Sequence, residues 1–130
     1  KFKDFHLKDI QINKNDGNIK IINFWATWCS PCKKEMPSLD DLQTKNSDIL
    51  IYPINLEKPN QEKTMKFFKD LNIKELKIYF DPDFQLTKQF KIKGVPTTIL
   101  LDKKGNEFAR IIGEADFNNK KFLKWLKEFN

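Results

Sequence analysis

The segment NFWATWCSPCKKEMP, from Asn23 to Pro37, holds both cysteines of this 130-residue chain. Cys29 and Cys32 are separated by Ser30 and Pro31, and they stand where an apolar run gives way to a run with helical character. A pair with this spacing serves as a structural disulfide, as part of a metal site, or as a redox couple. The rest of the sequence has to decide among these three uses.

The size and charge of the chain limit the classes of protein that it can be. Its length fits one domain over residues 1–130. The net charge is +6, and almost all of the positive charge comes from lysine. Acidic residues are interleaved with the lysines, and no basic stripe carries aromatic side chains, which argues against a nucleic-acid partner. The pattern favours a solvated surface that suits acidic partners.

Hydrophobic periodicity predicts strands and helices that alternate along the chain. We expect strands at residues 5–10, 19–25, 49–55, 76–80, 97–101 and 107–112, helices at 30–45, 60–71, 83–90 and 117–129, and turns at 15–18 and 103–106. Asn60 and Asp83 are the expected helix caps. The expected inward side chains include Met65 and Phe68 in the second helix, and Phe122, Leu126 and Phe129 in the last. This order predicts an α/β fold with a central mixed sheet and helices on both faces.

The cysteine pair falls at the end of a predicted buried strand and the start of a predicted helix. Unpaired N–H groups and the helix dipole stabilise negative charge at a helix N-terminus. We therefore expect the thiol pKa of Cys29 to fall below the free value of about 8.5, so that Cys29 is the attacking thiolate. Cys32 lies one turn into the helix, within disulfide distance but more shielded, and is expected to resolve the mixed disulfide.

The other uses of a cysteine pair fit the sequence less well. A structural zinc site needs four ligands, yet the chain has no second cysteine pair and its one histidine, His6, is distant in sequence. A disulfide that closes so short a loop constrains the unfolded chain little, so a purely structural role is also disfavoured. The interpretation is a redox pair that requires no metal and no cofactor.

Three spaced motifs carry a resemblance to a known family. NFWATWCSPC (Asn23 to Cys32), the helix proline Pro37, and GVPTT (Gly94 to Thr98) together resemble the thioredoxin superfamily over nearly the whole chain. The resemblance implies a thioredoxin fold in which Pro96 is cis and lies beside the disulfide, leaving the Val95 backbone free to pair with an extended substrate segment. It implies a substrate-binding surface formed by Trp28, Ser30, Pro31, Val95 and Pro96.

Departures from plain thioredoxin point to one branch of the superfamily. Asn23 stands where plain thioredoxin has a buried acid, and Glu35 follows Cys32 by three positions, on the same helix face. Partial burial would raise the pKa of Glu35, which could then take the proton of Cys32; the alternative is an exposed first-turn acid. Together with an N-terminal strand extension and a central insert at roughly 59–80, this resembles the TlpA/ResA-like (DsbE/CcmG-type) thiol-disulfide oxidoreductases.

That resemblance implies a protein-disulfide reductase that works outside the cytoplasm. The expected partner is a disulfide-bearing protein, such as an apocytochrome c or a copper-centre assembly factor. The expected electron donor is a membrane thiol reductase. The chain begins at Lys1 rather than Met, and we expect a monomer in the periplasm or its equivalent, anchored through a segment absent from this sequence. The alternatives are a general cytosolic thioredoxin and a thioredoxin-like binding module with incidental cysteines.

Overall fold

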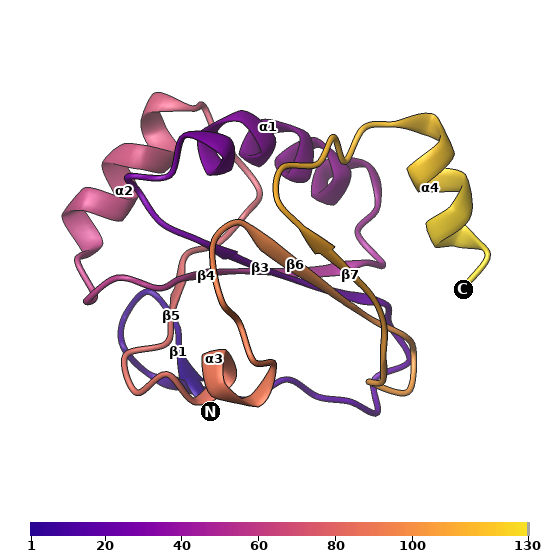
Figure 1. Ribbon diagram of the computed structural model, residues 1–130, viewed down its shortest axis with the longest axis horizontal. Coiled ribbons are helices and arrows are strands. Elements are labelled where there is room, and N and C mark those ends of the chain that lie inside the picture. Colours follow the sequence, from indigo (N-terminus) through magenta and orange to yellow (C-terminus); the bar gives the residue numbers. More distant parts are fainter. Residues whose placement is uncertain (130) are drawn as a thin grey trace.

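The computed structural model describes residues 1–129, which form a single sheet with helices around it (Figure 1). The strands are β1 (Phe2–Lys3), β2 (Asp9–Ile10), β3 (Lys20–Trp25), β4 (Leu50–Asn55), β5 (Tyr79–Phe80), β6 (Thr97–Leu101) and β7 (Glu107–Ile112). The helices are α1 (Ser30–Lys45), α2 (Gln61–Asp70), α3 (Gln85–Gln89) and α4 (Lys120–Lys127).

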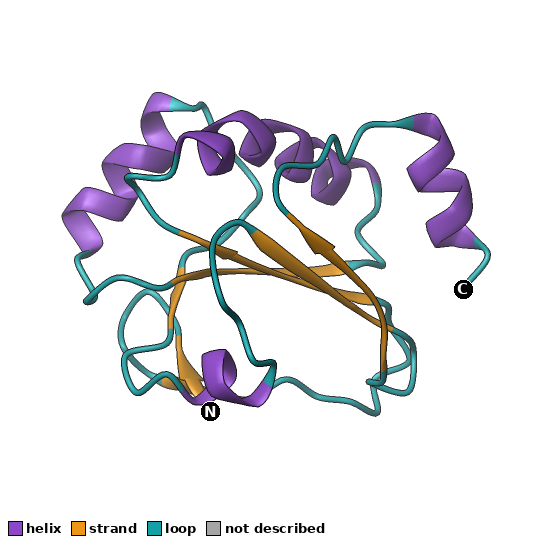
Figure 2. Ribbon diagram, viewed as in Figure 1, coloured by secondary structure: helices purple, strands orange, loops and turns teal. Residues whose placement is uncertain are grey.

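The strands, orange in Figure 2, form a mixed sheet. Their order is β2-β1-β5-β4-β3-β6-β7. The central strand β3 runs parallel to β4 and antiparallel to β6, and all of its residues are buried. Its largely apolar sequence is typical of a strand that is covered on both faces. Since β3 leads directly into the cysteine segment, the most buried strand of the sheet positions the functional site.

Helices cover both faces of the sheet, as the sequence predicts. Ile21 and Trp25 of β3 share one apolar core with side chains of α1, α2 and α4, whereas Ile22 and Phe24 face a second core with Leu86 of α3. Figure 1 shows α1 and α2 above the sheet and α3 below it. Alternate β3 side chains thus point to opposite layers, which places Asn23 on the side of α1.

The strand predicted at residues 5–10 is confirmed only at Asp9–Ile10. Phe2–Lys3 and Asp9–Ile10 instead pair as a short antiparallel hairpin, and residues 5–7 form its turn. The Asp4 carboxylate accepts the backbone N–H groups of His6 and Lys8, both at 2.9 Å. A short acidic side chain that binds nearby backbone in this way competes with strand formation, and the apolar/polar alternation does not reveal it.

The cap predicted at Asp83 is also wrong. Phe84, in a left-handed conformation with φ of 55°, precedes α3, and no side chain caps the helix at that position. The Asp81 carboxylate accepts the backbone N–H of Thr87 at 2.9 Å and of Leu86 at 3.4 Å. Asp81 therefore binds the first N–H groups of the helix from further upstream than a simple N-cap.

Two predicted core side chains lie at the surface. Met65 is exposed on α2, and Phe67 takes its place beside Phe68 against the sheet. Phe129 is partly exposed, although its ring stacks on Phe108 with the ring centroids 4.2 Å apart. The N-terminal cap of α2 is Asn60, as predicted. Helical spacing identified the buried face of α2 only to within one residue.

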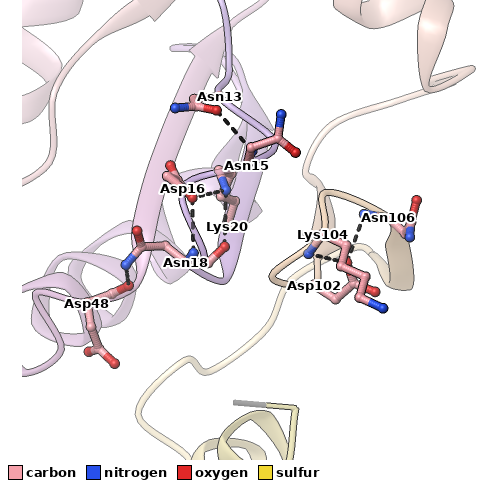
Figure 3. A network of polar contacts seen from close by, with 9 residues as sticks. All are labelled: Asn13, Asn15, Asp16, Asn18, Lys20, Asp48, Asp102, Lys104 and Asn106. Atoms are coloured by element: carbon pink, nitrogen blue, oxygen red, sulfur yellow. Dashed lines mark hydrogen bonds and ion pairs between the residues drawn. The ribbon is translucent and has the colours of Figure 1, made fainter.

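Two turns hold the end of the sheet where β3 begins and β6 ends (Figure 3). The buried ammonium group of Lys20 donates to the Asp16 carboxylate at 2.6 Å, and Asp102 accepts the backbone N–H groups of Lys104 and Asn106. Gly105 has φ of +84°, and a Cβ there would lie 2.7 Å from Lys14. Both turns were predicted, and their contact requires glycine at residue 105.

Candidate functional site

The two cysteines lie where β3 ends and α1 begins. Cys29 is the N-cap of α1, and it forms a disulfide with Cys32 in which the Cα atoms are 5.2 Å apart. The backbone N–H of Cys32 donates to the Sγ of Cys29 at 3.2 Å. Both residues are buried in the oxidised state. This N–H is aimed at the first sulfur, so it stabilises negative charge there when the disulfide is opened.

Glu35 is buried beneath the disulfide-bearing turn, with 1% of its surface exposed. Its Oε2 accepts the Nδ2–H of Asn23 at 2.7 Å, and its Oε1 accepts the N–H of Ala115 at 3.2 Å. Desolvation raises the pKa of Glu35 to about 7, although these two hydrogen bonds oppose the shift and the nearby charge of Glu114 adds to it. The exposed first-turn acid is therefore the wrong alternative.

Asn23 connects Glu35 to the sheet. Its Nδ2 also donates to the Oγ1 of Thr98 at 3.0 Å, so the amide bridges α1 and β6 from the middle of β3. Its Oδ1 is buried and has no hydrogen-bond partner among the described residues. Because Asn23 is a neutral amide, Glu35 is the titratable side chain among the three linked residues Asn23, Glu35 and Thr98.

Glu57 holds the loop that leads to the cysteines. Its carboxylate accepts the N–H of Thr27 at 2.7 Å and the Oγ1–H of Thr27 at 2.9 Å. It also accepts from the Nδ2 of Asn55 at 3.0 Å and from the Nζ of Lys63 at 3.1 Å. We call residues 26–29, between β3 and α1, the active-site loop. One carboxylate thus ties this loop to the end of β4 and to α2. Sequence reasoning did not identify this residue.

The predicted substrate-facing residues before and between the cysteines are at the surface. Trp28 is 73% exposed, whereas Trp25 is fully buried and packs against Phe67 and Phe68 of α2. Ser30 and Pro31, the first residues of α1, are exposed. An exposed tryptophan beside a disulfide is a large apolar contact surface that nothing in the fold requires.

The second predicted segment reaches the same end of the sheet. The Val95–Pro96 peptide bond is cis, as the resemblance predicts. Val95 packs against the core cluster that contains both cysteines, and Pro96 is buried directly before β6. Because Thr97 pairs with Phe24 on β3, this segment lies beside the strand end that leads to Cys29.

Ile112 is a surface residue that the sequence reasoning missed. It pairs with Thr97 across the sheet and is 81% exposed, and the N–H of the next residue, Gly113, donates to the Pro96 carbonyl at 2.9 Å. Alternation along β7 puts Ile112 in register with the exposed Arg110. The sequence offered one sign of this exposure: Ile112 is an apolar residue at an alternate strand position that otherwise carries the charged residue Arg110.

Two other features are absent from residues 1–129. No group of three or more His, Cys, Asp or Glu side chains in this part of the chain is arranged to hold a metal ion. None of its helices has both the length and the apolar character needed to cross a membrane.

Comparisons with known proteins agree on one family. Residues 7–130 match the thioredoxin-like domain. The thiol-disulfide oxidoreductase ResA of Bacillus cereus is 32% identical over 112 residues, which cover 85% of this chain and 64% of ResA. The thiol:disulfide interchange protein HelX of Rhodobacter capsulatus is 34% identical over 98 residues, which cover 75% of this chain and 54% of HelX.

A solved structure extends the agreement to the fold. The crystal structure of StoA from Bacillus subtilis is similar with a TM-score of 0.75 and 30% identity, covering 98% of this chain and 92% of the StoA chain. The chain spans 64% of the length of the ResA sequence that it matches. The matched region includes the cysteine pair, the cis-proline segment and the sheet that joins them. This chain belongs to the thioredoxin-like domain family.

Proposed function

We propose that this domain is a thiol-disulfide oxidoreductase that reduces disulfides in partner proteins. The observation that carries the proposal is the Cys29–Cys32 disulfide at the N-terminus of α1, with a buried carboxyl group at Glu35 on the same helix. A helix terminus favours the thiolate, and a carboxyl group that titrates near neutral pH can move a proton. The relatives named as thiol-disulfide oxidoreductases support the same chemistry.

The first step joins the domain to its partner. The thiolate of Cys29 attacks one sulfur of the partner disulfide, forming a mixed disulfide and releasing the second partner sulfur as a thiolate. The backbone N–H of Cys32 stabilises the attacking sulfur. Trp28 and the Val95 segment contact the partner chain around its disulfide, and Ile112 extends this surface.

The second step releases the partner. Glu35, as the carboxylate, takes the proton of the Cys32 thiol, and the Cys32 thiolate attacks the Sγ of Cys29. The Cys29–Cys32 disulfide forms, and the remaining partner sulfur leaves as a thiolate that is then protonated. Two electrons have passed from the domain dithiol to the partner disulfide. A second dithiol protein must reduce Cys29–Cys32 before the next cycle.

The partner and the compartment follow from the resemblance to the TlpA/ResA-like branch. We place the domain outside the cytoplasm, as a monomer attached to the membrane through a segment absent from this sequence. The electron donor is then a membrane thiol reductase. The partner is an apocytochrome c or a copper-centre assembly factor, because both classes carry cysteine pairs that must be reduced before they bind their cofactor or metal.

A trapping experiment tests the reaction. Cys32→Ser removes the resolving thiol, so the mixed disulfide formed by Cys29 accumulates. After incubation with extracytoplasmic extract from the native cells, complexes that dissociate with dithiothreitol should appear on non-reducing gels, and mass spectrometry identifies the partner. Cys29→Ser is the control and should trap nothing.

The alternatives predict different outcomes. If Cys32→Ser binds a partner but no covalent complex forms, the domain is a binding module. If NADPH and thioredoxin reductase reduce the domain and it reduces insulin rapidly, it is a general thioredoxin instead. Asn23 in place of a buried acid argues against that second outcome.

A further inference from the structure

A groove opens beside the disulfide, between the active-site loop and α2. We call it the loop–α2 groove; its volume is about 390 Å³. Trp28 and Lys33 line one wall, and these residues flank the two cysteines in the sequence. Lys63, Lys66 and Phe67 of α2 line the other wall. Because Trp28 directly precedes Cys29 and Lys33 directly follows Cys32, the groove adjoins the segment that carries the disulfide.

The groove offers apolar contact through two of its lining side chains, Phe67 and Trp28. Phe67 is largely buried, with its ring centroid 4.6 Å from that of Trp25, so it forms a rigid base. Trp28 stands exposed on the opposite wall. An aromatic or long aliphatic side chain of a partner fits between two such surfaces and loses little conformational freedom when it binds there.

The charge around the groove is positive. Three lysines, Lys33, Lys63 and Lys66, line it, against one acidic residue, Asp70. Lys63 pairs with Glu57 and Lys66 with Asp70, but no carboxylate among the described residues pairs with Lys33. The Lys66–Asp70 pair is exposed on both sides, so it is weak and leaves Lys66 free to meet an incoming carboxylate.

We propose that the loop–α2 groove binds an acidic segment of the partner, in which an apolar side chain and one or two carboxylates flank the reacting cysteine. The apolar side chain packs between Trp28 and Phe67, and the carboxylates face Lys33 and Lys66. The inference rests on the proposed disulfide exchange, because it concerns which disulfides reach Cys29. It assigns to α2 a role in choosing the partner.

The test compares peptides that differ only beside the cysteine. Each contains one disulfide and a phenylalanine, with flanking aspartates, asparagines or lysines, and the reduced domain is assayed for kcat/KM on each. The asparagine peptide serves as the neutral reference, so a change in the intrinsic reactivity of Cys29 cancels in each ratio. The wild-type domain should prefer the aspartate peptide over the neutral one by about fivefold at low salt, and less at 1 M salt.

Charge reversal identifies the residues responsible. Lys33→Glu and Lys66→Glu should each abolish the preference for aspartate, and the double variant should prefer the lysine peptide. Lys103→Glu and Lys104→Glu are matched controls, because both lysines are exposed in the turn between β6 and β7, and they should keep the wild-type ratio. The reduction of hydroxyethyl disulfide should be retained in both control variants.

The outcomes separate the two proposals. If no variant and no wild-type sample reduces any disulfide, the proposed function fails. The groove proposal is overturned, while the proposed function stands, if the wild-type domain reduces the aspartate and asparagine peptides with nearly equal kcat/KM. It is also overturned if Lys103→Glu and Lys104→Glu lose the preference for the aspartate peptide as much as Lys33→Glu and Lys66→Glu do.

Discussion

Glu35 shows how the protein obtains a proton acceptor that works near neutral pH. A carboxyl group in water titrates well below pH 7, but the burial of Glu35, on the side of α1 that faces Asn23 of β3, disfavours its charged form. Asn23 and Ala115 donate hydrogen bonds that limit the shift. Because Asn23 is neutral, a single carboxyl group sets the proton balance, rather than a coupled pair.

The pH dependence of the second step should follow Glu35. In the wild-type domain, the rate of mixed-disulfide resolution should rise with pH with a midpoint near 7. Glu35→Gln should remove this inflection and slow the step by about a hundredfold, as is typical when a general base is lost. Rapid-quench alkylation across pH 5–9 measures the step. Glu114→Gln, at an exposed site, should retain the inflection but move it to lower pH, because the charge of Glu114 is one cause of the raised pKa of Glu35. An unchanged profile in Glu35→Gln would contradict the assigned role.

Glu35 should also make folding stability depend on pH. Its pKa rises from 4.5 to about 7 on folding, so the folded protein binds the proton more tightly than the unfolded chain does. Stability should therefore fall as the pH rises from 4.5 to 7, by about 3 kcal/mol, and this contribution should be constant above pH 7. Urea denaturation of wild type and Glu35→Gln measures it as a difference between the two proteins. A difference that does not vary with pH would show that the carboxyl group is solvated.

At the scale of elements, the active-site loop depends on a carboxylate from another segment. Burial alone would raise the pKa of Glu57, but hydrogen bonds from Thr27, Asn55 and Lys63 outweigh it and leave the pKa below its usual value. The charged form of Glu57 is therefore the one that the fold stabilises. It joins the loop, the end of β4 and α2 into one unit beside the loop–α2 groove.

Removing this carboxylate should loosen the loop. Glu57→Ala should cost about 1.5–3 kcal/mol of stability at neutral pH, because hydrogen bonds to a charged group are lost and Thr27 is left unpaired. The pKa of Glu57 is lowered on folding, so this deficit should shrink as acid protonates the wild-type carboxylate. Denaturant unfolding at pH 7 and pH 3 measures it. Glu62→Ala, at an exposed site on α2, should change stability by less; an equal cost would contradict the assignment.

The open edge of β4 is closed by a side chain and a proline. Among the described residues, β5 pairs only with Ile54 and Asn55, so the first half of β4 lacks a neighbour on that side. The Gln43 amide donates to the Ile49 carbonyl at 2.7 Å and accepts the Ile51 N–H at 3.2 Å. Pro53, next on that side, has no N–H to offer. The edge is therefore a poor template for another strand.

Gln43→Ala should expose that edge. The change should cost about 1–2 kcal/mol, because two backbone groups of β4 lose their partner. It should also increase self-association on heating, measured by light scattering next to a denaturant unfolding curve. Lys45→Ala on the exposed face of α1 is the control. If both variants behave alike, Gln43 does not protect the edge.

At the scale of the whole molecule, the elements that the sequence predicts well are those whose signals are local. β3, α1, β6 and β7 match the prediction closely because an apolar run, a helix-starting Ser-Pro pair or a Gly-Asn turn bounds each of them. The paired cysteines and the buried Glu35 follow from the same local motif. Their chemistry depends on residue types at fixed spacing within one helix turn.

The features that escaped prediction depend on contacts between distant segments. Glu57 binds Thr27 from thirty positions away, and Ile112 reaches the Pro96 segment only through the register of β6 and β7. The hairpin at the N-terminus depends on β1 pairing with β5. No local pattern encodes such contacts, because they arise only when the sheet order is known.

The direction of the redox reaction depends on the reduction potential of the folded domain. Ser30-Pro31 between the cysteines is close to the Gly-Pro pair of reducing members, and it differs from the Pro-His pair of strong oxidants. We expect a reduction potential nearer the value of about −270 mV for thioredoxin than the value of about −120 mV for DsbA. Equilibration with glutathione buffers, followed by alkylation and mass spectrometry, measures it. A potential above about −150 mV would reverse the proposed direction.

The hydrogen bond from Ala115 to Glu35 joins residues that are 80 positions apart. During synthesis, both thiols therefore leave the ribosome long before the segment that completes the surroundings of Glu35. Until then, the nascent chain presents two ordinary thiols and a carboxyl group in water. Its distinctive chemistry is acquired only when the segment that carries Ala115 has folded onto α1, so C-terminal truncations that stop short of Ala115 should yield chains with both sulfurs but without a proton acceptor matched to neutral pH.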